Sequence, residues 1–246
     1  MKTFKFFSLS DNTKNVSSYY GIRIATSPTD ITGYPISEAF NIPGKVRKPV
    51  FYNGQWNTVT RVYNISFPGN GQETAVYATI RSINTWLFSE GYCRLEDDFD
   101  TDVYRMARCI TSIEYNQIEG RAGQAQLEFE CDARKFLKSA ETLTAVTKNS
   151  TLVNPGLQAN PTILVTTSGA GTLTIGSYSV QISGNPGAPI KIDSEKMTIT
   201  NQTGTTNYSS YISRMLDFPR LVRGSTTVTW NGSISAVSIA PNWWQP

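Results

Sequence analysis

A single segment of this sequence has the periodicity of a long helix, and this limits the fold more than any other feature. Apolar side chains recur there in steps of four, three and four, which places them on one helical face: Val76, Ile80, Ile83 and Leu87. The predicted helix runs from about residue 72 to residue 89, and Gly91 follows it as a residue that tolerates positive φ. The rest of the chain must therefore supply sheets on which this helix packs.

The composition favours strands and turns over further helices. The 246 residues include 18 glycines and 12 prolines, and the 39% hydrophobic content is enough for a sizeable core. A net charge of +3 is too small to indicate nucleic-acid binding by itself. No stretch reaches the length of a membrane span, and Lys5 interrupts the apolar run at the N-terminus, so we expect a cytosolic product without membrane insertion.

Short strands are expected before the helix, at residues 3–7, 21–25, 46–52 and 55–67. Asn53-Gly54 separates the last two and predicts a tight hairpin turn.

A second hairpin is predicted after the helix, with arms at 103–115 and 124–131. The second arm alternates strictly between apolar and polar residues, as a half-buried strand does. A turn centred near Gly120 brings the apolar faces of the two arms together. In this register, Cys109 pairs with Cys131, Ile113 with Leu127, and Tyr115 with Ala125.

A polar stretch at residues 142–160 predicts a linker between an N-terminal domain, 1–141, and a C-terminal domain, 161–246. Seven short strands are expected in the C-terminal domain, at 162–167, 172–175, 178–183, 190–192, 196–200, 226–230 and 233–239. Asn231-Gly232 predicts a hairpin turn between the last two, and Gly169-Ala170-Gly171 predicts another turn. This pattern indicates a β-sandwich.

The sequence offers little catalytic chemistry. It contains no histidine, which removes Ser-His and Cys-His nucleophiles together with all histidine metal sites. The acidic run 96–102 has the spacing of a calcium loop, but Val103 and Cys109 stand where such a loop needs glycine and glutamate. We therefore predict no catalytic residue, cofactor or metal, and we interpret the acidic run as a solvated connection.

The remaining candidate residues are thiols and aromatic rings. The sequence contains three cysteines, Cys93, Cys109 and Cys131. Their odd number and wide spacing favour reduced thiols in a core over a disulfide framework. Trp243 and Trp244 are candidates for stacking on a sugar, although closing the core is the favoured role for both.

Residues 83–139 resemble the distal tail protein (Dit) family of long-tailed siphophages. The shared motifs, in order, are Trp86-Leu87, Gly91-Tyr92, the acidic run, Tyr104 to Arg108, Gly120 to Gly123, Leu127 to Cys131 and Lys135 to Ser139. The C-terminal half adds Phe218-Pro219-Arg220-Leu221 and a closing Pro-x-Trp-Trp, with Asn242 where the family often has arginine.

The resemblance implies a mainly β protein with one helix. It implies an N-terminal β-sandwich or barrel-like domain, with the helix and a long hairpin, that forms a six-fold ring, and a C-terminal galectin-like β-sandwich. Such a ring is a structural hub, not an enzyme, and it joins the tail tube to the tail tip or tail-associated lysin and the receptor-binding apparatus.

The same resemblance implies assembly in the host cytoplasm, a final place at the virion tail tip, and DNA only as passing cargo. Tyr104, Arg105, Arg108 and Tyr115, on the predicted hairpin, are the candidates for self-association. The alternative function is a carbohydrate-binding β-sandwich module that acts on the host cell surface.

Overall fold

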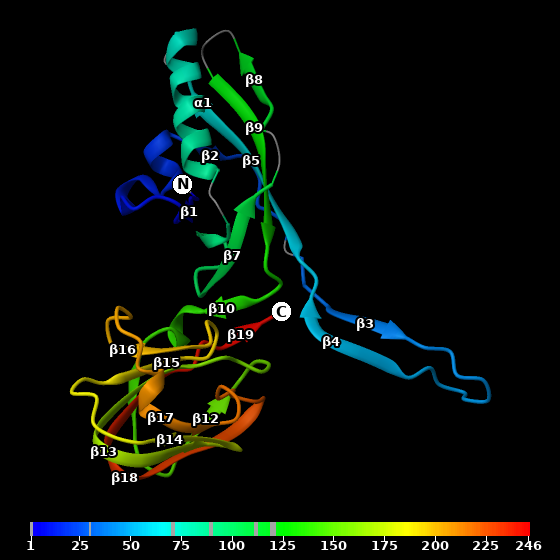
Figure 1. Ribbon diagram of the computed structural model, residues 1–246. Coiled ribbons are helices and arrows are strands. Elements are labelled where there is room, and N and C mark those ends of the chain that lie inside the picture. The colour runs from blue at the N-terminus through cyan, green and yellow to red at the C-terminus, as the bar shows by residue number, and fades with distance from the viewer. Residues whose placement is uncertain (1, 30, 70–71, 89–90, 111–112, 119–121) are drawn as a thin grey trace. The chain divides into compact units, whose positions relative to one another are not determined.

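The computed structural model describes residues 2–29, 31–69, 72–88, 91–110, 113–118 and 122–246 (Figure 1). They form two compact units, 1–135 and 136–245, each built mainly of antiparallel strands. Within the described ranges there is one α-helix, so the predicted fold class of a mainly β chain with one helix is confirmed. That helix is neither long enough nor apolar enough to span a bilayer, and the described ranges contain no other candidate.

The first unit is organised on a sheet of order β1-β6-β7-β9-β5-β2, with β8 paired to β9. The strands are β1 (Phe4–Phe6), β2 (Arg23–Ile24), β5 (Val59–Pro68), β6 (Cys93–Asp97), β7 (Val103–Cys109), β8 (Tyr115–Ile118) and β9 (Ala122–Cys131). Two 3-10 turns, η1 (Asn12–Lys14) and η2 (Ser17–Tyr20), follow β1. Both β5 and β9 alternate strictly between buried and more exposed residues, which gives the sheet one apolar face.

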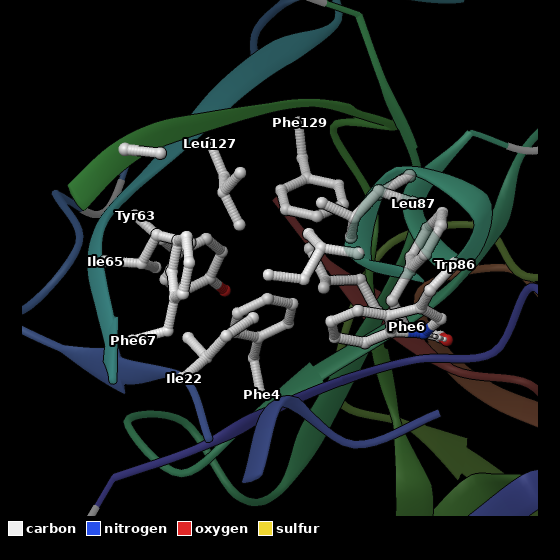
Figure 2. Packing of buried hydrophobic residues seen from close by; sticks show 14 of the residues in the cluster. Phe4, Phe6, Ile22, Tyr63, Ile65, Phe67, Trp86, Leu87, Leu127 and Phe129 are labelled. Carbon is white, nitrogen blue, oxygen red and sulfur yellow. Dashed lines mark hydrogen bonds between the residues drawn. The ribbon is translucent and has the colours of Figure 1, made fainter. Parts of the chain in front are cut away.

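The helix α1 (Glu73–Leu87) covers this apolar face and ends two residues before the predicted end. It buries Val76, Ile83 and Leu87 of the predicted stripe together with Trp86, and Ile80 is half-buried. Gly91 has a φ of 128° but lies beyond the helix end. Trp86 stacks on Phe4 at 5.3 Å between ring centroids, and its indole N–H donates to the Phe6 carbonyl at 2.8 Å. Figure 2 shows these rings in one cluster with Phe129, so the helix is fixed to β1 by both stacking and a buried hydrogen bond.

The predicted hairpin after the helix forms, but its register is partly wrong. Tyr115 opposes Ala125 as predicted, whereas Cys109 opposes Phe129 and Cys131 opposes Ala107. Six positions separate Cys109 from Tyr115, but only four separate Phe129 from Ala125, so the first arm contains two extra residues and divides into β7 and β8. Ile113 lies in the segment between these strands, and the turn at Gly120 lies outside the described residues.

The second unit has the strand order β11-β18-β13-β14-β17, with β12 on β18, β15 on β13 and β16 on β15. Its strands are β11 (Thr144–Val146), β12 (Ser150–Asn154), β13 (Thr162–Ile175), β14 (Tyr178–Ile182), β15 (Ile190–Asp193), β16 (Thr198–Asn201), β17 (Ile212–Met215) and β18 (Gly224–Ala240). Two short strands outside this sheet, β10 (Lys135–Leu137) and β19 (Trp244–Gln245), pair with each other. Two 3-10 turns, η3 (Lys138–Ala140) and η4 (Ser209–Tyr211), complete it. Residues 142–160, expected as a linker, contribute β11 and β12, which both pair with β18.

Both turns predicted in the second unit are wrong, because β13 and β18 are long continuous strands. Gly171 opposes Gly232, so the two expected turns face each other in the middle of one strand pair. A Cβ on Gly232 would lie 2.5 Å from the Ala170 carbonyl oxygen, and its φ is 68°. The glycines therefore permit a close backbone approach at an irregularity in the ladder.

Candidate functional site

The most unusual surface of the first unit is a two-stranded arm formed by β3 (Pro35–Ala39) and β4 (Val50–Trp56). Every residue from 36 to 55 is exposed, although the arm has a regular ladder in which Ser37 opposes Tyr52 and Ala39 opposes Val50. In the part of the chain that the structure describes, these two strands pair only with each other (Figure 1). A lone two-stranded hairpin is at best marginally stable in water, so contact with another surface would stabilise this arm.

The tip of the arm is a tight turn that the sequence interpretation missed. The Lys45 N–H donates to the Ile42 carbonyl at 3.1 Å, and Gly44 has a φ of 83°. Proline at the second turn position and a positive-φ glycine at the third are the signature of a type II turn. Pro43-Gly44 was therefore the signal that could have located the hairpin.

Asn53-Gly54, the predicted turn, is instead a bulge within β4. Four positions separate Tyr52 from Trp56, but only two separate their partners Ser37 and Pro35. The Asn53 carboxamide oxygen accepts the Gln55 N–H at 2.9 Å, and Gly54 has a φ of 80°. The same local conformations that suit a hairpin turn also suit a bulge, and the pairing with β3 decides between them.

The arm presents large apolar side chains on both faces. Tyr52 and Val50 share one face, and Phe51 lies on the other, because neighbouring residues of a strand point to opposite sides. The exposed fractions are 60% for Tyr52 and 64% for Phe51, and Phe40 is 51% exposed. Exposed apolar residues in such a cluster mark an interaction site. Near the tip the cluster is bordered by three cations, Lys45, Arg47 and Lys48.

Two of the predicted self-association residues hold β7 within its own unit. The Arg94 guanidinium lies 4.0 Å from the centroid of the Tyr104 ring, a close cation–π contact. Arg108 donates from Nε to Glu130 at 3.0 Å, and the Tyr92 hydroxyl donates to the same carboxylate. The bond from Arg108 lowers the pKa of Glu130, while burial and the bond to Glu130 raise the pKa of Tyr92 to about 12.

The other two predicted residues are also engaged inside the first unit. Arg105 is 5% exposed and lies beside Arg61 and Asp97. The Tyr115 hydroxyl donates to the Asn84 side-chain oxygen at 2.6 Å, which links β8 to α1, and burial raises the pKa of Tyr115. Self-association through these four residues stays a prediction, but their contacts in this structure are intramolecular.

The two C-terminal tryptophans differ in their surroundings. Trp244 is 6% exposed, and its indole N–H donates to the Gln158 carbonyl at 2.7 Å, as the core-closing role requires. Trp243 is half-buried, and its carbonyl accepts the Leu137 N–H at 2.9 Å. A ring as buried as that of Trp244 offers no face to a sugar, so stacking stays a prediction for Trp243 alone.

One carboxylate of the acidic run, that of Asp97, forms buried contacts that the sequence did not predict. Asp97 is buried: its carboxylate pairs with Arg61 at 2.7 Å and accepts the Tyr63 hydroxyl at 2.6 Å. Its other oxygen accepts the backbone N–H groups of Phe99 and Asp100. The interpretation of this run as a solvated connection is therefore wrong at Asp97. Among the described residues, no group of three or more histidine, cysteine or acidic side chains is placed to hold a metal ion.

No protein-family model matches this chain, and no curated protein matches it by sequence. Two solved structures match it over almost its whole length. One is the crystal structure of the Dit protein of phage SPP1, a paradigm of the hub adsorption apparatus in phages that infect Gram-positive bacteria. The TM-score is 0.65 at 16% identity, over 97% of this chain and 98% of that one. This chain has the fold of the phage distal tail proteins.

The second structure is the baseplate of phage P2 in its activated conformation with Ca. It matches with a TM-score of 0.50 and 9% identity, over 97% of both chains. The chain as a whole thus has a Dit-like fold, which confirms the resemblance inferred from the motifs around α1 and β7.

Proposed function

We propose that this protein is a structural subunit of a phage tail, or of a phage-derived particle, and forms a ring that acts as a hub. The observation that carries the proposal is the arm, whose apolar side chains are exposed on both faces. The Dit-like fold supports the same role, since the SPP1 protein belongs to a hub adsorption apparatus. The ring joins the tail tube to the tail tip or baseplate and the receptor-binding apparatus.

The proposed ring contains six copies joined head to tail. A head-to-tail contact closes into a ring when its rotation divides a full turn, and each copy then contributes one arm and one receiving surface. The arm is suited to this contact because its apolar side chains are exposed on both faces. The C-terminal unit, in this proposal, is a galectin-like sandwich.

The assembled ring belongs to the virion tail tip, is made in the host cytoplasm, and surrounds a channel through which DNA passes. Its partners are the tube protein, the tail-tip or lysin protein and the receptor-binding protein. Its role is structural and not enzymatic, and the absence of histidine from the sequence removes the common nucleophile–base pairs.

The proposal is tested by removing the arm. Pro35 and Trp56 are cross-strand partners, so an Asn-Gly turn can replace residues 36–55 without moving the strand ends. We expect the natural chain to give rings by negative-stain microscopy and native mass spectrometry, and the shortened chain to give monomers. Rings that survive removal of the arm would contradict the proposed contact, and a natural chain that stays monomeric at high concentration would contradict the hub itself.

A milder pair of variants separates the apolar contact from the length of the arm. Phe40→Ser combined with Phe51→Ser removes one aromatic ring from each strand region while keeping the arm intact. The matched control is Tyr19→Ser combined with Tyr77→Ser, which removes two exposed rings elsewhere on the same unit. We expect ring loss in the first variant only, because truncating interface aromatics typically weakens association strongly.

A further inference from the structure

A groove on the outer face of the second unit has no role in the proposed ring. It lies along β14 and β17, which are neighbours in the sheet (Figure 1), and has a volume of about 420 Å³. Val180 and Ile182 of β14 are buried, so Ser179 and Gln181 point to the opposite, outer face. Arg214 opposes Gln181 across the ladder and therefore lies on the same face.

The groove is rich in hydrogen-bond donors that the protein does not use. Across the described ranges, no side chain or backbone group of the protein bonds to the side chains of Ser177, Ser179, Gln181 or Arg214. The carboxylate in the lining, Asp217, is already occupied: it pairs with Arg220 at 3.2 Å and accepts the Phe218 N–H at 2.8 Å. The guanidinium of Arg214 thus sets the charge of the groove, and an anionic group is the complementary ligand.

The other side chains that line the groove indicate which further chemical groups the ligand carries. Serine hydroxyls and a carboxamide both donate and accept hydrogen bonds, as recognition of sugar hydroxyls requires. Leu216 is 88% exposed at the end of β17 and offers an apolar surface to the C–H face of a sugar ring. A guanidinium binds carboxylate or phosphate through paired N–H donors. The volume lies within the range of small-molecule sites.

We propose that this groove binds a saccharide that carries a carboxylate or phosphate group. Arg214 holds the anionic substituent, Gln181 and the two serines bind hydroxyls, and Leu216 contacts the ring. This site is separate from Trp243 and Trp244, and it does not depend on ring formation, so either proposal can fail alone.

The test measures binding of defined probes to the full chain by titration calorimetry. The probes are a hyaluronan tetrasaccharide, which carries carboxylates, a glycerol phosphate oligomer, and neutral chitotetraose. We expect saturable binding of at least one anionic probe, weaker binding of the neutral one, and at least about a tenfold loss of affinity on Arg214→Gln. Ser177→Ala combined with Gln181→Ala should weaken binding of the same probe.

Arg223→Gln is the matched control, because Arg223 is exposed on the same unit and outside the lining, and its loss changes the charge equally. An equal loss of affinity in both arginine variants would show general charge attraction and overturn the site. Binding of a tetraglutamate peptide as tight as that of the saccharides would overturn the ligand class. Absence of binding by both anionic probes would overturn the proposal outright.

Discussion

Replacing Asp97 by alanine tests the most concentrated polar contact in the first unit. The carboxylate accepts from Arg61 Nε at 2.8 Å, from the Tyr63 hydroxyl at 2.6 Å, and from the N–H groups of Phe99 and Asp100 at 3.0 and 3.1 Å. The side chains of Asp97 and Arg61 are each 6% exposed, so little solvent screens the pair. Removing one member leaves the other as a buried, uncompensated charge.

We expect Asp97→Ala to destabilise the first unit by about 3–5 kcal/mol, the usual loss when one partner of a buried pair is removed. Arg61→Met combined with Asp97→Leu should recover about 1–2 kcal/mol of this loss, since apolar residues of similar size replace the pair. The recovery stays incomplete because Tyr63 and the two backbone N–H groups still lose an acceptor, at about 1 kcal/mol each.

The assay is native-state hydrogen exchange followed by mass spectrometry, because a chain of two units need not unfold in one step. Peptides from β5 and β6 report the first unit, and peptides from β13 and β18 serve as the internal control. A loss below about 1 kcal/mol for Asp97→Ala, or an equal loss in both units, would refute the reasoning. So would a double variant as unstable as Asp97→Ala alone.

Two further predictions concern single sites in the two units. Burial raises the pKa of the Cys131 thiol to about 12, whereas the pKa of the same thiol in the unfolded chain is about 8.5. The contribution of this thiol to stability is therefore complete below about pH 8.5 and decreases above it, because the thiol of the unfolded chain then loses its proton. Between pH 8 and 9.5 the urea midpoint of the first unit should fall, and Cys131→Val should lose this dependence; an identical decline in both would contradict the assignment. Gly232→Ala should destabilise the second unit by about 1–3 kcal/mol more than Gly204→Ala. Gly204 also has a positive φ of 80°, but a Cβ there meets nothing within 4 Å; equal urea midpoints for the two variants would contradict the close-approach argument.

The sequence predicted correctly those elements in which apolar residues recur at a regular spacing over many consecutive positions. The stripe that includes Val76 and Ile83 defined α1, and the alternation of β9 defined a half-buried strand with the correct pairing at Tyr115. Both succeed because burial repeats with the geometry of the element itself.

The misplaced turns share one cause, which is that glycine-containing turn signals also occur inside long strands. Asn53-Gly54 and Asn231-Gly232 have positive-φ glycines, as hairpin turns do, yet both lie within continuous strands. The distant partners Pro35 and Gly171 decide the outcome, and a local pattern does not contain them.

The hairpin of the arm was missed for a different reason, although a strand was predicted at residues 46–52. Its residues from 36 to 55 are all exposed, so no alternation between buried and exposed positions marks its strands. The candidate residues chosen from the predicted hairpin, among them Tyr104 and Arg108, had conspicuous chemistry but intramolecular partners. The sequence shows which charged and aromatic side chains a strand carries. It does not show which groups they contact, because these contacts depend on how the strands pair.

An exposed apolar ribbon with two open edges is also a hazard for aggregation, and the arm carries the features that oppose it. Pro35 and Pro49 lack backbone N–H groups and therefore interrupt any ladder that a foreign strand could build on the edges. Lys45, Arg47 and Lys48 add like charges that repel the tips of identical arms. Indiscriminate strand-to-strand pairing is thereby disfavoured, and only a surface that matches the side chains of the arm gains from contact with it.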